Sequence, residues 1–396
     1  MGPTPLPFTL GVVTQPSHPD DVTRARLIPP VPVAVAPMAG GPSTPELVAA
    51  VVGAGGGGFL AGGMRTATQM REQVDALRAL LGAEGPDRWG VNLFVPDAVN
   101  TAIPDAARTE AARSARTAAV AAYRAGLTAD GAAGLPTAAD VVPDPDAERA
   151  DFDALLTAAE EQAWPLVSFT FGLPAADVFA RLAAAGIPAG ATVTDATEAR
   201  AALDHGAAFL VVQGHRAGGH RGTSDPAAEP TRAEMPTVLA AVRDVVGTGA
   251  ASAMPVVAAG GVGTAEDVRA LLTAGADAVA AGTAFLLTPE AGTSAAHRAA
   301  VAACAAGTRF SADDGRARTA LTRAYTGRWA RSLATAFMAE HPDAPAAYPE
   351  VNVLTKGLRA AAAAAGDLER VHLWAGTEAH RVREAPAADV LASLAP

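Results

Sequence analysis

Val256-Val257-Ala258-Ala259-Gly260-Gly261-Val262-Gly263-Thr264 is the stretch of sequence that decides the fold, and Ala280-Ala281-Gly282-Thr283-Ala284-Phe285 repeats its pattern. In both stretches an apolar run of strand length ends in a glycine-containing turn. Parallel barrels commonly build a phosphate site from the turns after their last two strands, where backbone N–H groups and a helix start point at one place. The two stretches therefore predict the last two strands of a (β/α)8 barrel.

Short apolar runs alternate with Ala- and Leu-rich helical patterns from about residue 31 to residue 290, as in proteins built from βα units. The predicted strands are Val31–Pro37, Gly57–Ala61, Trp89–Phe94, Leu166–Phe171, Gly190–Thr194, Ala208–Gln213, Pro255–Ala259 and Ala276–Ala281. An open, doubly wound sheet would alternate in the same way, but eight units can close a barrel and the paired turns favour closure. The predicted fold class is α/β, a TIM (β/α)8 barrel.

Two segments are too long for the minimal barrel repeat. The segment from Pro96 to Asp151 is Ala-rich and is broken by glycines and prolines, so we expect a helical hairpin with a loose loop. The remainder of the chain after the last strand is mostly helical in pattern. We therefore predict a cofactor-binding barrel over residues 1–290, with an insert at about 96–151, and a helical lid or substrate-binding region over residues 291–396 that completes the barrel.

The composition restricts the partners of this chain. Its formal net charge of −11 argues against nucleic acid and against an anionic membrane surface, because both need clustered cations. Met1 to Asp20 lack the pattern of a signal peptide, no apolar run is long enough to span a membrane, and the single cysteine, Cys304, cannot form an internal disulfide. We expect a cytoplasmic monomer or homodimer whose partner is a small molecule.

Residues just after the first predicted strand and one residue within the third are candidates for binding a planar ligand, because barrel chemistry lies at the carboxyl ends of the strands. Met38, Ala39 and Gly40 form a turn that leaves room against the backbone, although an ordinary tight turn would have the same sequence. Asn92 places one amide in an apolar run. It could bind the edge of a heterocycle or be satisfied internally.

The sixth predicted strand leads into His215-Arg216-Ala217-Gly218-Gly219-His220, the most informative loop of the chain. Its glycines allow a ligand close to the backbone, and a histidine in such a loop can transfer protons near neutral pH. His215 and His220 lack the i, i+4 spacing of a helical metal pair, and no carboxylate or thiol nearby completes a ligand set. We therefore expect proton transfer here and no metal ion.

The glycine turns predict the cofactor. Gly260, Gly261 and Gly263 follow the seventh predicted strand, and Gly282 and Thr283 follow the eighth. No strand-linked G-x-G-x-x-G with a later acidic residue and no Walker loop is present, which argues against a dinucleotide or a P-loop nucleotide. A mononucleotide with its phosphate at these turns and its ring across the barrel mouth is the simplest ligand, and this predicts FMN.

Motifs spread over nearly the whole chain resemble one known family. They are Ala36–Gly41, Val91–Phe94, Val167–Phe169 with Phe171-Gly172, Gln213-Gly214 with Ala217–His220, Ala258–Gly261, Thr326–Arg328, Tyr348-Pro349, Lys356 and Leu373–Gly376. The family is that of the nitronate monooxygenases, formerly called 2-nitropropane dioxygenases, to which the flavin enoyl reductases of fatty-acid synthesis are similar. Gln213 favours the monooxygenase branch, because the reductase branch typically carries an acidic residue there.

The resemblance implies an activity and a set of site residues. In the family FMN oxidises an alkyl nitronate, such as propionate 3-nitronate, with O2, and a carbonyl compound and nitrite are formed. The catalytic histidine falls on His220, the flavin contacts fall on Met38, Asn92, Gln213, Gly218, Gly219, Gly261, Gly282 and Thr283, and Tyr348 and Lys356 match positions that face flavin and substrate. His220 could deprotonate a neutral nitroalkane or, when protonated, hold a nitronate anion.

Arg216 is the main departure from the family, which usually carries Glu there, and the reversed charge predicts contact with an acidic substrate. Lys356 is either a cation near that substrate or a solvated helix lysine. We expect His372 to be structural and His297 to lie at the surface. Three alternative functions stay open: a flavin enoyl reductase, a specialised biosynthetic FMN oxidoreductase, and a flavin-free barrel that serves as a binding or scaffold protein.

Overall fold

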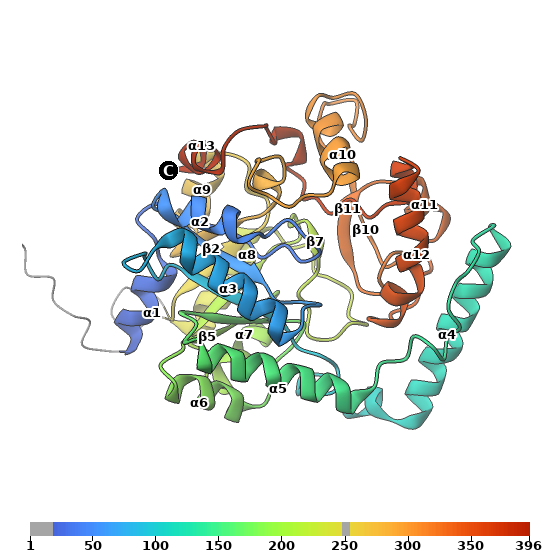
Figure 1. The fold of residues 1–396 in the computed structure, drawn as a ribbon, viewed down its shortest axis with the longest axis horizontal. Helices are drawn as coiled ribbons and strands as arrows, with labels where there is room; N and C mark the ends of the chain where they lie inside the picture. The colour runs from blue at the N-terminus through green and yellow to red at the C-terminus, as the bar shows by residue number, and fades with distance from the viewer. Residues whose placement is uncertain (1–18, 248–253) are drawn as a thin grey trace, which may run out of the picture.

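A closed barrel of eight parallel strands, in the order β1-β2-β3-β4-β5-β6-β8-β9, forms the body of the molecule (Figure 1). The structure is a computed structural model that describes residues 19–247 and 254–396. Most of the segment from Met1 to Asp20, in which we expect no signal peptide, lies outside the described residues. The strands are β1 (Val33–Val35), β2 (Gly57–Ala61), β3 (Trp89–Phe94), β4 (Val167–Thr170), β5 (Ala189–Val193), β6 (Phe209–Gln213), β8 (Val256–Ala259) and β9 (Ala278–Ala281).

All eight predicted strands are confirmed, and the alternative of an open sheet is wrong because β1 pairs with β9, with Ala34 opposite Ala280. Their ends differ from the predicted ends by up to two residues. Successive side chains face opposite sides, as a strand requires: Phe59 and Phe209 belong to one buried cluster, whereas Leu60 and Leu210 belong to another. Burial on both faces explains why the sequence shows short, continuous apolar runs.

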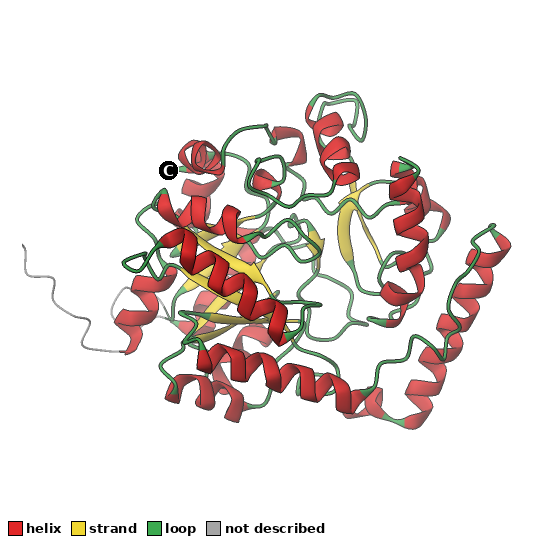
Figure 2. Cartoon of the chain, in the orientation of Figure 1, coloured by secondary structure: helices red, strands yellow, loops and turns green. Residues whose placement is uncertain are grey.

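Helices coat the outside of the barrel (Figure 2). They are α2 (Pro45–Gly53), α3 (Ala67–Leu81), α5 (Pro145–Glu161), α6 (Ala176–Ala184), α7 (Ala196–Asp204), α8 (Met235–Val246) and α9 (Ala265–Thr273), with α1 (Pro19–Leu27) before the first strand. The last helix, α13 (Ala387–Leu394), packs against α2 and α9, and Val390, Leu391 and Leu394 join the main core. The end of the chain therefore supplies part of the helical coat.

Residues 291–396 also contain strands, which the sequence pattern did not predict. Between α10 (Ala295–Ala305) and α11 (Ala336–Glu340), the strands β10 (Thr319–Thr322) and β11 (Ala330–Leu333) form a small sheet with β7 (Gly219–His220), in the order β10-β11-β7. His220 lies opposite Ala330 in this sheet. The loop after β6 is therefore held by the C-terminal region, which continues into α12 (Glu350–Ala364) and the short 3-10 helices η3 (Leu368–Arg370) and η4 (Ala379–Arg381).

The insert after β3 is a packed structure and not a loose loop. It contains η1 (Asp105–Arg108) and α4 (Glu110–Ala129), and Figure 1 shows α4 beside α12, away from the barrel. Val120 and Leu127 of α4 share a buried cluster with residues of the C-terminal region, among them Tyr325 and Phe337. The connection that follows α4 contributes Leu135, Ala138 and Val141 to the same cluster, which explains why it is ordered.

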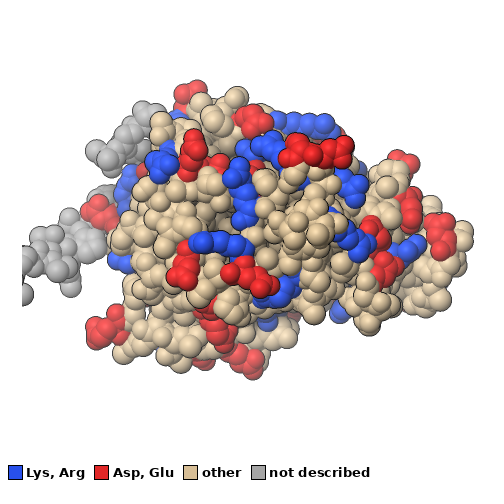
Figure 3. Space-filling view, turned by 90° about the horizontal axis from the view of Figure 1, so that it is seen from above, with Lys and Arg blue, Asp and Glu red and all other residues tan. Residues whose placement is uncertain are grey.

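In the part of the chain that the structure describes, no helix has both the length and the apolar character needed to cross a membrane. On the face shown in Figure 3, basic and acidic side chains are interspersed and do not gather by sign. That face therefore offers no continuous cationic patch of the kind that a phosphate backbone requires.

Candidate active site

A cavity of about 260 Å³ lies at the carboxyl ends of the barrel strands, where this fold places its chemistry. The predicted site residues that line it are Met38, Ala39, Gly40, Asn92, Gln213, Arg216, Gly218, Gly219, His220, Gly260, Gly261, Gly282 and Thr283. The C-terminal region adds Asn352, Arg359, Val371, His372, Trp374, Gly376 and Glu378. The cavity is therefore built jointly by the barrel and by the region predicted to cover it.

The turn after β8 has unpaired backbone donors at this cavity. Gly260 and Gly261 have φ angles of +107° and +76°, a left-handed backbone that glycine adopts without strain. The N–H groups of Gly261 and Val262 have no hydrogen-bond partner within the described residues. Gly263 does not line the cavity, and its N–H donates to the Asp267 carboxylate at 2.9 Å in the cap of α9. Gly263, which the sequence predicts as a cofactor contact, is therefore not among the residues that the structure brings to the cavity, and the helix cap uses its donor.

The turn after β9 brings a hydroxyl group to the same end of the cavity. Thr283 Oγ1 accepts a hydrogen bond of 3.0 Å from the N–H of Gly376, which leaves the hydroxyl hydrogen of Thr283 free to donate. A Cβ atom on Gly282 would lie 3.3 Å from the Met38 sulfur, so glycine allows the turns after β1 and β9 to approach closely. The two turns and the C-terminal segment thus converge at one place.

The two amide side chains predicted to contact the flavin differ in what they can offer. Asn92 donates through Nδ2 to the hydroxyl groups of Ser168 and Thr170, both at 2.9 Å, and its Oδ1 accepts from no group among the described residues. Gln213 donates through Nε2 to the His220 carbonyl at 2.9 Å, and its Oε1 accepts from the N–H of Gly222 at 2.8 Å. Asn92 has a free acceptor, whereas Gln213 holds the β7 turn in place.

His220 is fixed as one tautomer by its neighbours. Its Nε2 lies 2.9 Å from the hydroxyl oxygen of Thr326, and that hydroxyl donates to the carbonyl of Arg328 at 3.3 Å. One hydroxyl hydrogen cannot serve both contacts, so His220 donates through Nε2 and its Nδ1 carries the lone pair. Within the described residues, Nδ1 has no partner.

His220 is also held in its neutral form. Its ring lies 5.2 to 5.7 Å, centroid to centroid, from the rings of Phe171, Tyr348 and Trp374. Burial, together with the positive charges of Arg328 and Arg359, lowers its pKa to about 3. The histidine therefore offers an uncharged lone pair to the cavity at neutral pH.

Tyr348 lies beside the histidine and is not part of the cavity wall. Its ring is 5.5 Å from that of Phe171, and burial raises its pKa to about 12. The phenol therefore remains protonated at neutral pH. Tyr348, which the sequence predicts to face flavin and substrate, contacts His220 but does not itself line the cavity.

Arg359 and His372 line the cavity, and neither was predicted to do so. Arg359 donates to Asn352 at 2.8 Å and to the Thr355 hydroxyl at 3.1 Å, yet it forms no ion pair with a carboxylate among the described residues. It also donates to Nδ1 of His372 at 3.2 Å, which places the proton of that imidazole on Nε2. Burial lowers the pKa of Arg359 to about 10 and that of His372 well below its usual range. The cavity thus holds a cation beside a neutral N–H donor.

Lys356, which the sequence predicts as a substrate residue, is not among the α12 residues that the structure brings to the cavity. Its side chain is exposed and does not line the cavity. The helix buries Val351 and Thr355, and Arg359 continues that face four residues after Thr355. Helical periodicity could have identified Arg359, because residues four apart lie on the same face of a helix.

His297 is buried and lines the cavity, so its predicted surface position is wrong. Its imidazole lies 3.0 Å from the carbonyl of Trp374, which only accepts, so Nε2 is the donor. Burial lowers the pKa of His297 to about 4. Over residues 19–247 and 254–396, no three His, Cys, Asp or Glu side chains are grouped as metal ligands.

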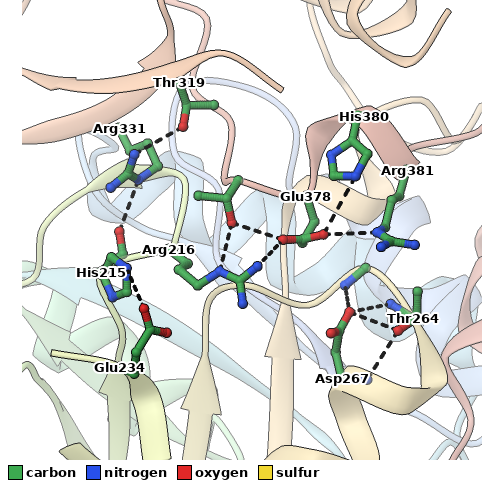
Figure 4. A network of polar contacts seen from close by, with 12 residues as sticks. His215, Arg216, Glu234, Thr264, Asp267, Thr319, Arg331, Glu378, His380 and Arg381 are labelled. Carbon is green, nitrogen blue, oxygen red and sulfur yellow. Dashed lines mark hydrogen bonds and ion pairs between the residues drawn. The ribbon is translucent and has the colours of Figure 1, made fainter. Parts of the chain in front are cut away.

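Arg216 points toward the C-terminal segment. Figure 4 shows its guanidinium directed at Glu378, which Arg381 approaches from the other side. Arg216 also donates through Nε to the hydroxyl of Thr377 at 3.2 Å, and its side chain lies against Gly261 of the β8 turn. The charge that was predicted to meet an acidic substrate is therefore paired, at the end of the cavity formed by the glycine turns.

Comparison with known proteins identifies relatives over most of the chain. The sequence profile of the nitronate monooxygenase family matches residues 23–396. A nitronate monooxygenase of Paraburkholderia phytofirmans is 34% identical over 394 aligned residues, which cover 94% of this chain and 95% of that protein. A nitronate monooxygenase of Pseudomonas aeruginosa is 41% identical over 232 residues, which cover 58% of this chain and 62% of that protein, less than two thirds of its length.

Solved structures show the same architecture. A nitroalkane oxidase from Streptomyces ansochromogenes superimposes with a TM-score of 0.74 at 39% identity, over 93% of this chain and 95% of that one. FabK from Thermotoga maritima superimposes with a TM-score of 0.63 at 22% identity, over 94% of this chain and 93% of that one. The second likeness concerns the fold alone.

Proposed function

This chain belongs to the nitronate monooxygenase family, and from that premise we propose that its cavity binds FMN and oxidises alkyl nitronates, such as propionate 3-nitronate, with O2. The products would be a carbonyl compound and nitrite. One observation carries this proposal more than any other: the neutral imidazole of His220 lines the same cavity as the cation Arg359, which forms no ion pair among the described residues. An uncharged acceptor beside a fixed positive charge suits a substrate that is already an anion.

The residues at the cavity fit FMN. The free N–H groups of Gly261 and Val262 and the hydroxyl of Thr283 are donors suited to a phosphate. The free Oδ1 of Asn92 can accept from a ring N–H of the flavin. A Cβ atom on Gly219 would meet no atom within 4 Å, so the backbone there leaves open space for a ligand. FMN, when bound, supplies the redox chemistry by accepting electrons from the substrate and passing them to O2.

His220 is proposed to act as a hydrogen-bond acceptor and a weak base through Nδ1. The sequence left two roles open, and the low pKa argues against the protonated one. A general base works best when its pKa lies near the operating pH, so a histidine with a pKa of about 3 is poorly suited to removing a proton from a neutral carbon acid. The structure therefore favours a preformed nitronate over a neutral nitroalkane as the substrate.

Arg359 and His372 are proposed to hold the negative charge of the nitronate. Arg359 stays charged at neutral pH, since its pKa is about 10, and no carboxylate among the described residues neutralises it. The Nε2–H of His372 supplies a second donor, whose position is set by the Arg359 hydrogen bond. A cation and an N–H donor in a half-buried cavity bind an oxyanion more strongly than they would in water.

We also infer that the enzyme works in the cytoplasm as a monomer or homodimer. The single thiol supports the first part, because Cys304 is buried and free, as is usual in a reducing compartment. The proposal names O2 as the second substrate and needs no nicotinamide.

Oxygen consumption and nitrite release with propionate 3-nitronate test the proposed function. Purified, FMN-loaded protein is expected to consume O2 and release nitrite with the nitronate. Both rates should be far lower with 3-nitropropionate, at a pH below that at which the carbon bearing its nitro group loses a proton. Equal rates with both would contradict the assigned substrate form. No nitrite from either would contradict the proposed activity itself.

A further inference from the structure

The loop after β6 and the segment before η4 are joined directly above the glycine turns. The carbonyl of Arg216 accepts from the N–H of Thr377 at 3.1 Å. A Cβ atom on Gly218 would lie only 2.5 Å from the nitrogen of Gly376, so the two backbones are in van der Waals contact. Gly376 in turn donates to Thr283 of the β9 turn. Three separate parts of the chain therefore meet at this end of the cavity.

One buried carboxylate at this junction is shared by two arginines. Glu378 is buried, with 6% of its side chain exposed, and it is the carboxylate that pairs with both Arg216 and Arg381, the latter at 3.0 Å (Figure 4). The third nearby group, His380, lies 4.0 Å from the same carboxylate. Two guanidinium groups share the Glu378 carboxylate, so this carboxylate alone cannot neutralise both arginines.

Arg216 has one terminal nitrogen without a partner among the described residues, and its side chain lies beside Gly261. Two of its nitrogens are used, Nε by Thr377 and one terminal nitrogen by Glu378, while Nη1 has no partner within the described residues. A Cβ atom on Gly261 would lie 3.2 Å from Cδ and 3.4 Å from Nε of Arg216. The arginine therefore packs against the same residue whose N–H group is unpaired.

We propose that Arg216, held in place by Glu378, is the cation that binds the phosphate of the flavin, so that the chain selects FMN over unphosphorylated riboflavin through this side chain. This inference rests on the proposed function, because it assumes that the cavity takes a flavin. It replaces the expectation that Arg216 selects an acidic substrate. A planar guanidinium with one terminal nitrogen on a carboxylate and the other on a phosphate is a geometry that arginine provides and lysine does not.

Binding of FMN and riboflavin to flavin-free protein tests this inference, with the dissociation constants measured from flavin fluorescence. Wild-type protein is expected to prefer FMN. In Arg216→Ala the affinity for FMN should fall roughly ten- to hundredfold, the worth of one or two charge-assisted hydrogen bonds, while the affinity for riboflavin stays unchanged. Arg309→Ala is the matched control, because it removes an arginine of similar exposure that pairs with Glu369 and does not line the cavity.

Two further variants distinguish loss of the Arg216 charge from loss of its packing against Gly261. Arg216→Gln and Arg216→Lys both keep a long side chain against Gly261, but only Lys keeps the charge. We expect Lys to retain part of the preference for FMN and Gln to lose it. Equal weakening of both flavins in all three variants would show that Arg216 only ties the loop to Glu378, and this would overturn the inference.

The outcomes also separate this inference from the proposed function. If wild-type protein binds neither flavin, the proposed function fails and this inference fails with it. If wild-type protein prefers FMN and every Arg216 variant keeps that preference unchanged, the flavin site stands and the role of Arg216 is refuted.

Discussion

Arg359 donates through Nη1 to Nδ1 of His372 at 3.2 Å, and both side chains line the cavity at the barrel mouth. Because arginine can only donate, this one contact decides which nitrogen of the histidine carries the proton. The contact joins α12 to the segment before Trp374, and it sets a cation and an N–H group side by side. The anion-binding side of the proposed site depends on this pair.

Removing the cation should weaken substrate binding more than turnover. In Arg359→Gln we expect KM for a nitronate to rise roughly ten- to hundredfold, because a charge-assisted hydrogen bond to an anion is lost, with a smaller change in kcat. Steady-state kinetics and flavin content give the two measurements. Lys356→Gln is the matched control on the same helix, since that side chain is exposed, and an equal rise in KM there would refute the assignment.

Removing the imidazole should slow the reaction without emptying the flavin site. In His220→Ala we expect kcat/KM for a nitronate to fall roughly ten- to hundredfold, because the hydrogen-bond acceptor that positions the reacting groups is lost. The FMN content should stay at the wild-type level, because the Gln213 contact is to the backbone carbonyl of His220 and not to its side chain. Retention of full activity would remove His220 from the chemistry.

The pH profile should show no histidine titration near neutrality. Since the pKa of His220 is about 3, its neutral form is complete throughout the range from about pH 5 to pH 8. We therefore expect kcat/KM for a preformed nitronate to be flat across that range. A decrease with an apparent pKa near 6.5 would mean that the histidine changes charge during the reaction and would contradict the neutral role.

His297 should make the protein less stable in mild acid. Its pKa is about 4 in the folded state and its ordinary value is 6.5, so the unfolded chain binds the extra proton between these values. The free energy of unfolding therefore rises with pH up to about 6.5. Between about pH 6.5 and pH 4 it falls by up to about 1.4 kcal/mol per pH unit for this one group. Urea unfolding near pH 7 and near pH 5 measures the loss, and His297→Gln should reduce it. An unchanged loss in that variant would refute the attribution.

A methyl group at Gly260 should disturb the glycine turn. Its φ of +107° disfavours any side chain, and a Cβ atom would lie 2.7 Å from backbone and side-chain atoms of Ala217. We expect Gly260→Ala to lower the free energy of unfolding by about 1–3 kcal/mol and to reduce FMN content. Gly357→Ala is the control, because nothing lies within 4 Å of that exposed helix position, and it should stabilise by about 0.5–1 kcal/mol.

The sequence predicted those parts of the site that lie at the ends of regular strands. Gly261 and Thr283 are predictable because the barrel brings the residues after each apolar run to one face, and Asn92 is predictable because it is the one amide within an apolar run. Motif resemblance points to Lys356, whereas helical periodicity on the same helix points to Arg359. The face that contains Thr355 also contains Arg359, and the structure buries that face.

Other parts depend on contacts between distant segments, which a single sequence does not show. The sheet of β7, β10 and β11 pairs residues 219–220 with residues of the C-terminal region, and β7 is too short to form a recognisable run. The same limit applies to the Arg216–Glu378 pair, whose members are 162 residues apart. The reversed charge of Arg216 was visible in the sequence, but its partner was not.

Anaerobic mixing of FMN-loaded protein with propionate 3-nitronate, followed by flavin absorbance, tests the central claim most directly. We predict that the nitronate bleaches the flavin, that NADPH does not, and that the bleaching is lost in His220→Ala although FMN stays bound. Reduction by NADPH with no response to the nitronate would contradict the proposed function and would identify a reductase on the same barrel.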